Sequence, residues 1–315
     1  MDARRIADEV LFPAAAQVDA TGRIPASHFD LLAAQGWYGR TDSLTGAASL
    51  TGAVETLASG CLSTTFVWLQ HFGALRAAGG SETPGLRERW LAPLAGGQRR
   101  AGIALGALRP GPPSVRATPV GGGYVIDGTA PWVTGWGYVD TLLTAARTAD
   151  GTIVWALLDA VEDARLTVTA LNLAAVNASR TVHIRLDGYP VPADRVTGTL
   201  PYAEWPERDA AGLRLNGSLA LGVVDRCRRL GRLDRLEPEL AACRSTLDTA
   251  TPQTMPAARA AASALAMRAA SALMVSAGAR GILAGEHAER LIREAAFLLV
   301  FGSRPGIRQA LSDLV

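Results

Sequence analysis

The 315-residue sequence contains no lysine, and all 31 of its basic residues are arginine. Without a lysine amine there is no Schiff base, which excludes pyridoxal-phosphate enzymes and lysine aldolases. The phosphate-binding P-loop is excluded as well, because its motif ends in Gly-Lys followed by Ser or Thr. The absence of lysine therefore excludes several classes of enzyme before any motif is considered.

Residues that ligate metals are also scarce. The three cysteines and four histidines are scattered and show none of the paired spacings of a zinc site: Cys61, Cys227, Cys243, His28, His71, His183 and His287. Three cysteines at these separations do not make a disulfide framework either. The sequence predicts no metal site.

Charge and hydropathy give no sign of a nucleic-acid or membrane partner. The net charge is only +2, which provides no electrostatic attraction to polyanions. The N-terminus lacks an apolar signal core, and no uninterrupted apolar run reaches the roughly 18–20 residues that span a bilayer. The most apolar stretch, 257–273, is interrupted by Arg259 and Arg268. We expect a cytoplasmic protein.

Three compositional regimes divide the chain, and we place the domains at 1–100, 101–197 and 198–315. The first has apolar residues at helical spacing, including 51–58, 64–78 and 86–94. The second has short runs separated by turn signals such as Gly121-Gly122, typical of a small β-barrel or sandwich. The third contains four long helical segments that fit a packed bundle: 213–230, 236–248, 256–277 and 286–300. The predicted fold class is therefore mixed α and β, mainly α.

Four strings occur in the order expected of one enzyme superfamily. They are Leu86–Gly97, Gly123–Thr134, Asp187–Ala193, and Glu289–Arg293 followed by Val300–Ser303. Together they resemble the acyl-CoA dehydrogenase superfamily over nearly the whole chain. The resemblance implies an N-terminal helical domain, a central β-domain, a C-terminal four-helix bundle and bound FAD. At 315 residues the chain is short for that superfamily, and part of the missing length falls in the bundle.

The sharpest part of the resemblance is Trp132-Val133-Thr134. In the superfamily the aromatic side chain lies against the flavin ring, and the Thr position hydrogen-bonds near its reactive nitrogen. A flat indole stacks on a flat ring, and a hydroxyl stabilises charge gained on reduction. The alternative is that Trp132 is simply a core residue of the β-domain.

Further cofactor contacts are implied at positions that match the superfamily less closely. Leu105 and Gly106 begin the second flavin-contacting segment, although its usual Thr is missing, and Ser114 replaces a hydroxyl in the turn that follows. Gly278 and Arg280 match a Gly-rich stretch near the adenosine end, where a guanidinium pairs well with phosphate. Ser303 matches the loop after the last long helix. A solvated surface arginine is the alternative for Arg280.

One phosphate-binding string of the superfamily is missing. It reads Arg-x-x-Phe-Gly followed by Gln, and nothing between Leu213 and Thr254 matches it. The Arg-rich segment 226–235 offers replacement charge. An arginine run on a helix is also typical of a solvated face.

The catalytic base expected of this superfamily is missing too. Dehydrogenation of an acyl thioester requires a carboxylate to remove the α-proton, and the usual position is Phe301 here. The alternative position, near Gly212 and Leu213, also lacks one. Glu207 and Asp209, expected in a nearby loop, and His71, expected on a pocket-lining helix, are the weaker candidates. Surface carboxylates and a core histidine are the simpler interpretations.

Three functions follow from these observations. The first is a flavin-dependent oxidoreductase acting on a thioester of CoA or of an acyl carrier protein. The second is a flavin monooxygenase of the same fold, which needs no α-proton base. The third is a non-catalytic or half-site subunit of a hetero-oligomer. For the first two the resemblance implies a homodimer or homotetramer.

Overall fold

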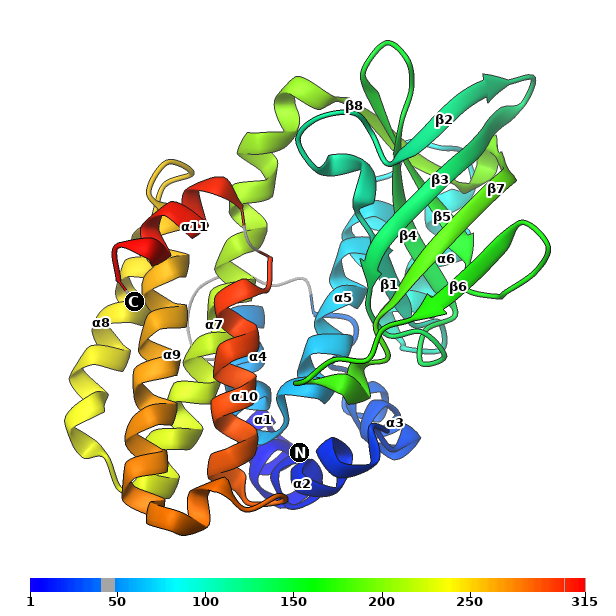
Figure 1. The fold of residues 1–315 in the computed structure, drawn as a ribbon. Helices are drawn as coiled ribbons and strands as arrows, with labels where there is room; N and C mark the ends of the chain where they lie inside the picture. The colour runs from blue at the N-terminus through cyan, green and yellow to red at the C-terminus, as the bar shows by residue number, and fades with distance from the viewer. Residues whose placement is uncertain (41–48, 303, 315) are drawn as a thin grey trace.

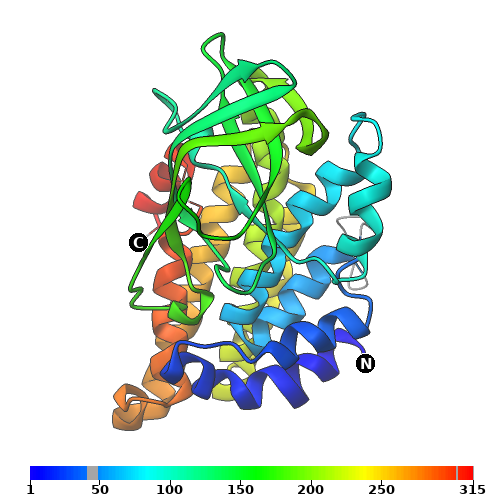
Figure 2. The same cartoon turned by 90° about the vertical axis from the view of Figure 1, so that its right-hand side faces the viewer.

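The structure is a computed structural model that describes residues 1–40, 49–302 and 304–314. Helices come first, a β-region follows, and helices return to the C-terminus, which confirms the predicted fold class (Figure 1). In both views the β-region lies at one end of the molecule and the N-terminal helices at the other (Figure 2).

The first helical region is organised around one buried helix. Helix α5 is buried along most of its length, and its buried residues include Ser63, Thr64, Thr65, Gln70 and His71 as well as apolar side chains. It contacts strand β1 on one side and helices α4, α6 and α7 on others, so it joins all three regions. The elements of this region are α1 Ala3–Arg5, the π-helix η1 Ile6–Leu11, α2 Phe12–Thr21, α3 Ala26–Ala34, α4 Leu50–Gly60, α5 Leu62–Gly79 and α6 Leu86–Ala95.

The β-region is one mixed sheet built of two four-stranded halves. One half has the order β6-β7-β3-β2; the other contains β4, β5 and β8 with β1 parallel to β4. A single residue pair, Arg116 with Arg147, connects β2 to β4, and one apolar cluster takes residues from both halves. The strands are β1 Ala101–Ala104, β2 Val115–Val120, β3 Gly123–Val133, β4 Thr141–Arg147, β5 Thr152–Asp159, β6 Leu166–Ala170, β7 Val182–Pro192 and β8 Val196–Pro201.

The first long helix of the C-terminal region begins earlier than its predicted start at residue 213. Helix α7 starts at Trp205, with Pro206 in its first turn, where a missing N–H costs nothing. Glu207 and Asp209 therefore lie on a helix, and the expected loop there is wrong. The helices are α7 Trp205–Gly231, α8 Glu237–Thr249, α9 Met255–Ala277, α10 His287–Val300 and α11 Pro305–Ser312, the last of which was not predicted.

Helix α9 and the turn after it are unusually apolar. The segment Met255–Ile282 is, by length and hydropathy alone, capable of crossing a membrane, yet half of its most apolar window is buried inside the bundle. Arg259 is buried and donates to the carbonyl of Leu298 at the end of α10, while Arg268 pairs with Glu239. Both arginines thus have partners within the bundle, and α9 packs as one of its helices.

Two glycines let helices cross at close range. A Cβ at Gly222 on α7 would lie 2.4 Å from the carbonyl oxygen of Glu55 on α4. A Cβ at Gly60 would lie 2.7 Å from the carbonyl oxygen of Ala7 in the π-helix. Helix α4 is therefore held directly between the N-terminal π-helix and α7 by backbone-to-backbone packing.

Candidate functional site

Trp132 sits at an irregular point of β3. The register between β3 and β7 shifts between Ala130 and Val133, which marks a bulge, and Trp132 has a φ of 61°. A non-glycine residue in this region of φ costs about 1–2 kcal/mol. The indole is 54% exposed, whereas Val133 beside it is fully buried. A strained backbone thus presents a large aromatic surface outward, a combination found at binding sites.

The strain around Trp132 is concentrated rather than scattered. Four non-glycine residues in the described chain have positive φ: one is Trp132 itself, and two others, Val176 and Arg180, flank the short helix Asn177–Ser179. The amide of Gly135 donates to the carbonyl of Ser179, and the amide of Trp136 donates to that of Arg180. The segment after Trp132 is therefore fixed by a second strained segment about forty-five residues further on in sequence.

Buried hydroxyls lie directly beneath the motif. The Thr134 hydroxyl is 3.1 Å from that of Thr181, which is 2.9 Å from the hydroxyl of Ser179. All three side chains are buried. Thr134 therefore already has a hydrogen-bond partner, and its orientation is set by a row of hydroxyls. Sequence reasoning missed Thr181 and Ser179, because only pairing of their segment with β3 brings them here.

His183 on β7 was also missed. Its ring meets the Trp132 indole edge to face, with centroids 5.9 Å apart and planes at 86°. Its Nδ1 accepts the Trp132 amide at 3.4 Å, a long hydrogen bond. In sequence His183 is a polar residue between two apolar strand residues, Val182 and Ile184. That alternation was a signal that it faces away from the core.

The second predicted contact segment lies close to the first. A Cβ at Gly106 would be 2.9 Å from both Pro131 Cδ and Ser114 Oγ, so only glycine fits there. The Ser114 carbonyl accepts the amide of Thr129 on β3. Gly106 and Ser114 thus meet at the residue preceding Trp132, with Leu105 half-buried alongside.

The residues predicted to contact the adenosine end of the cofactor lie far from Trp132 in the fold. Gly278 and Arg280 belong to η7, Gly278–Ile282, in the orange turn at the opposite end of the molecule from β3 (Figures 1 and 2). Arg280 is 79% exposed and pairs with Glu286, which raises its pKa. Within one chain these two residues do not meet Trp132. Ser303 lies outside the described residues.

Phe301, at the expected position of the base, belongs to a group of three phenyl rings. It stacks on Phe297 with centroids 5.3 Å apart, and both rings meet Phe66 of α5 edge to face. Aromatic contacts of this kind stabilise the packing by about 0.5–1.5 kcal/mol each beyond area burial. The chain therefore uses this position for packing between α5 and α10.

The two carboxylates near the start of α7 differ in their surroundings. Asp209 is held by Arg304, whose Nη2 lies 2.9 Å from Oδ1 and whose Nε lies 2.5 Å from Oδ2. This pairing raises the pKa of Arg304. Glu207 is exposed on the first turn of the helix. One carboxylate is thus occupied by an ion pair, and the other faces solvent.

His71 is a buried residue of the seam between α5 and β1. Its Nδ1 accepts the amide of Ala101, and its ring packs edge to face on Tyr38 and Phe72. Burial lowers its pKa to about 3, opposed by a smaller hydrogen-bonding contribution from the backbone of Leu94. At neutral pH this imidazole is uncharged and serves the core.

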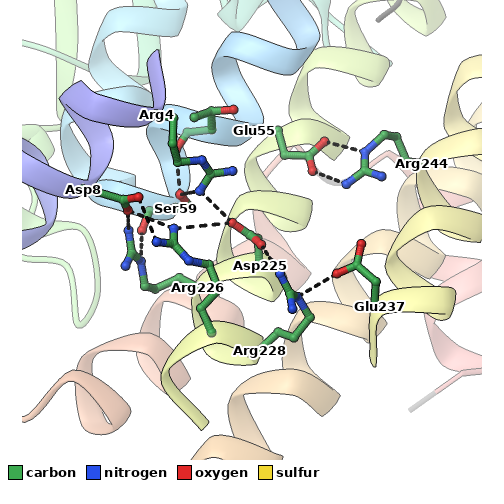
Figure 3. Close-up of polar contacts among 11 residues, drawn as sticks. Arg4, Asp8, Glu55, Ser59, Asp225, Arg226, Arg228, Glu237 and Arg244 are labelled. Atoms are coloured by element: carbon green, nitrogen blue, oxygen red, sulfur yellow. Dashed lines mark hydrogen bonds and ion pairs between the residues drawn. The ribbon is translucent and has the colours of Figure 1, made fainter. Parts of the chain in front are cut away.

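The arginines of α7 are largely committed to carboxylates. Figure 3 shows Arg226 between Asp8 and the Ser59 carbonyl, and Arg228 between Asp225 and Glu237. Arg229 also pairs with Asp8. These contacts tie the N-terminal helices and α8 to α7. The idea that this segment replaces the missing phosphate-binding string is therefore wrong for Arg226, Arg228 and Arg229.

No group of three or more His, Cys, Asp or Glu residues in the described ranges is placed to hold a metal ion. The site features that the structure brings together are instead aromatic and hydroxylic: Trp132, Thr134, Thr181, Ser179 and His183. The flat indole of Trp132 is exposed among the other four side chains, and a flat aromatic surface suits a planar organic ligand.

Comparison with known proteins supports the same architecture. No family model and no curated protein matches the sequence. Two solved structures each match over 99% of this chain. Butyryl-CoA dehydrogenase from Megasphaera elsdenii matches with a TM-score of 0.84 at 17% identity, over 95% of that chain. Glutaryl-CoA dehydrogenase from Mycobacterium smegmatis in complex with FADH2 gives 0.80 at 17% identity, over 92% of its chain.

A third match has a different kind of ligand. PigA with FAD and proline aligns with a TM-score of 0.82 at 16% identity, over 99% of this chain and 94% of that chain. These matches include all three regions, from the N-terminal helices to the final bundle. The chain has the fold of the acyl-CoA dehydrogenases.

Proposed function

We propose that the protein is an FAD-dependent oxidoreductase of acyl-CoA dehydrogenase type that acts on an acyl thioester of CoA or of a carrier protein. The observation that carries this proposal is the exposed, strained Trp132 above the buried Thr134, within a chain of this fold. A fold alone does not give a function, so the weight rests on the site.

The residues of this surface fit the ring end of FAD. Trp132 would stack on the flat ring, and Thr134 would hydrogen-bond at its edge, with Thr181 fixing the hydroxyl. Gly106 and Ser114 would support the neighbouring backbone. When bound, FAD would accept the electrons removed from the substrate. The chain's own contribution would be to orient the ring and keep water from one face.

The spectrum of the purified protein tests the proposal. We expect yellow protein with flavin near stoichiometry, and a large loss of flavin from the Trp132→Ala, Thr134→Ala double variant. Val161→Ala, an exposed apolar residue on a loop of the β-region, serves as the control and should retain its flavin. Colourless protein that stays colourless after incubation with FAD would contradict the proposal.

The phenyl group at Phe301 favours a second candidate, a monooxygenase that uses oxygen and needs no α-proton base. Phe cannot accept a proton, and the nearby acid on α7, Asp209, is bound to Arg304. Oxygen uptake with a chemical flavin reductant would support this candidate. Bleaching of the flavin by acyl-CoA without oxygen would support dehydrogenation instead.

The Phe301→Glu variant separates these two candidates further. If only the base is missing, a carboxylate there should raise anaerobic flavin bleaching by acyl-CoA by about 100-fold or more, as general base catalysis provides. Val300→Glu, one residue earlier and exposed, is the matched control. No gain with Phe301→Glu would count against the thioester dehydrogenase.

The assembly is proposed to be a homodimer or homotetramer. Val275 near the end of α9, Ile282 in the turn after it and Leu283 next in sequence are all exposed. Exposed apolar side chains that form a patch are typical of contacts between chains. Light scattering tests this against a monomer, and co-purification of a related chain would identify a hetero-oligomer.

A further inference from the structure

His183 contacts Trp132 in two ways. The imidazole and indole rings are nearly perpendicular, at 86°, with centroids 5.9 Å apart, and Nδ1 accepts the Trp132 amide at 3.4 Å. Both contacts link β7 to the bulged end of β3, where the register is interrupted. In the described chain, His183 supplies the ring that contacts this exposed indole.

The magnitudes of the two contacts differ. An edge-to-face pair of rings contributes about 0.5–1.5 kcal/mol beyond burial. A hydrogen bond of 3.4 Å lies beyond the usual N–H distances of about 2.7–3.2 Å and contributes less. The ring contact therefore dominates, and it acts on the side chain rather than on the backbone.

An exposed indole on a bulge is free to change rotamer unless something packs against it. Fixing a rotamer-rich side chain on binding weakens the affinity, and a preorganised site avoids this loss. His183 lies on the strand that pairs with β3, so its ring is held by the sheet. It can therefore restrict the indole before any ligand arrives.

We propose that His183 is a positioning residue that holds the Trp132 indole in the orientation that stacks on the flavin ring. This rests on the proposed function, because the ligand is the FAD of that proposal. His183 acts through Trp132 and takes no part in electron or proton transfer. Its contribution is therefore to FAD affinity and to the optical properties of the bound flavin.

Three substitutions in the full-length protein separate the contacts. His183→Ala removes both the ring and the acceptor, His183→Asn keeps an acceptor, and His183→Phe keeps a ring. We expect His183→Ala and His183→Asn to weaken FAD binding by about 2- to 10-fold, the fold-change that one aromatic contact provides. His183→Phe should bind within about 2-fold of the parent, because the dominant contact survives.

The second readout is the fluorescence of the bound flavin, which a stacked indole quenches. We expect brighter bound flavin in His183→Ala and parent-like quenching in His183→Phe, with melting temperatures close to that of the parent in both. Thr169→Ala is the matched control, since Thr169 is the direct cross-strand neighbour of His183 on β6. It should leave affinity and fluorescence unchanged.

The outcomes are distinguishable. Parent protein that binds no FAD overturns the proposed function, and the cofactor role of His183 with it. Parent protein that binds FAD normally, while His183→Ala shows parent affinity and quenching, overturns the His183 proposal alone. A His183→Phe variant as weak as His183→Ala also overturns it, because the ring contact would then not be the cause.

Discussion

The surface around Trp132 and the end of α10 around Phe301 are built on opposite principles. At Trp132 the chain accepts backbone strain, buries three hydroxyls and leaves an aromatic face open. At Phe301, where the sequence resemblance predicts a catalytic base, it packs three phenyl rings together. The first arrangement carries a cost in backbone strain; the second is ordinary aromatic packing.

The bundle and the β3 motif also differ in their use of charged side chains. The bundle places its arginines against carboxylates, as Arg226 does with Asp8 and Arg290 does with Glu294. The contacts of the β3 motif are made by hydroxyls, aromatic rings and a backbone amide. The β3 motif thus relies on aromatic and hydroxyl contacts, while the bundle uses charged groups to join α7 to the N-terminal helices. Four experiments would break or sharpen this contrast.

The largest effect is expected from Arg290→Met in the bundle. Arg290 and Glu294 form an ion pair with both side chains only 3% exposed. Removing one partner leaves an uncompensated buried charge, which costs about 3–5 kcal/mol. Urea unfolding measures this. The double variant Arg290→Met, Glu294→Leu should recover most of the loss, and a single variant with parent stability would mean that the bundle's charges are not structural.

Next is Gly222→Ala, which tests the close crossing of α4 and α7. The new methyl would lie 2.4 Å from a backbone oxygen, so helices must move apart at a cost of up to about 3 kcal/mol. Gly212→Ala on the same helix is the control. Nothing lies within 4 Å of its Cβ position, so it should stabilise by about 0.5–1 kcal/mol. Equal melting temperatures for both variants would contradict the packing.

His71→Asn tests whether the seam between α5 and β1 is core or catalytic site. The folded pKa of His71 is about 3, so between that value and the ordinary 6.5 only the unfolded chain takes up the proton. Stability therefore falls as pH drops through this window, by about 2 kcal/mol at pH 5.

An asparagine side chain at this position does not titrate, so the parent should lose more stability than His71→Asn between about pH 7 and pH 5. Asparagine also keeps an acceptor for the amide of Ala101. Unfolding curves at the two pH values give the comparison. Identical pH slopes for the two proteins would show that the folded pKa of His71 lies near its ordinary value, and hence that the ring is open to solvent or substrate.

The smallest change in stability is expected from Trp132→Gly. Relief of positive φ, about 1–2 kcal/mol, is offset by extra freedom of the unfolded chain and the lost ring contact, leaving less than about 0.5 kcal/mol. FAD retention should nevertheless be lost. Arg232→Gly, at the other described positive-φ residue, should leave FAD retention unchanged. A folded Trp132→Gly protein that keeps its FAD would remove the distinction between the two surfaces.

Much of the architecture could be predicted from local patterns. The helices at 64–78 and 86–94 follow from apolar periodicity and from Gly-rich stops, and the structure places them within a residue or two. The start of α7 was not found, because the helix was predicted from residue 213 and Glu207 and Asp209 were expected in a loop, whereas Pro206 lies in the first turn of the helix. The short helix α11 was missed because eight residues give little periodicity.

The candidate site was only half predictable, for a physical reason. Trp132 and Thr134 are close in sequence and form a recognisable string. His183 and Ser179 belong to another strand and another loop, and only sheet pairing brings them to the motif. Similarly, the sequence shows how many arginines α7 carries, but not which carboxylates they pair with. The carboxylate that binds Arg226 comes from the N-terminal π-helix, more than two hundred residues away.

By itself the sequence determined what this protein contains: no lysine amine, no clustered metal ligands, a phenyl ring instead of a base, and an aromatic-hydroxyl motif after a Gly-rich strand. Tertiary structure alone decided which of these groups are open and which are occupied. Exposure, strain and ion pairing depend on contacts between distant segments, and those contacts left Trp132 facing outward while they enclosed His71 and the arginines of the bundle.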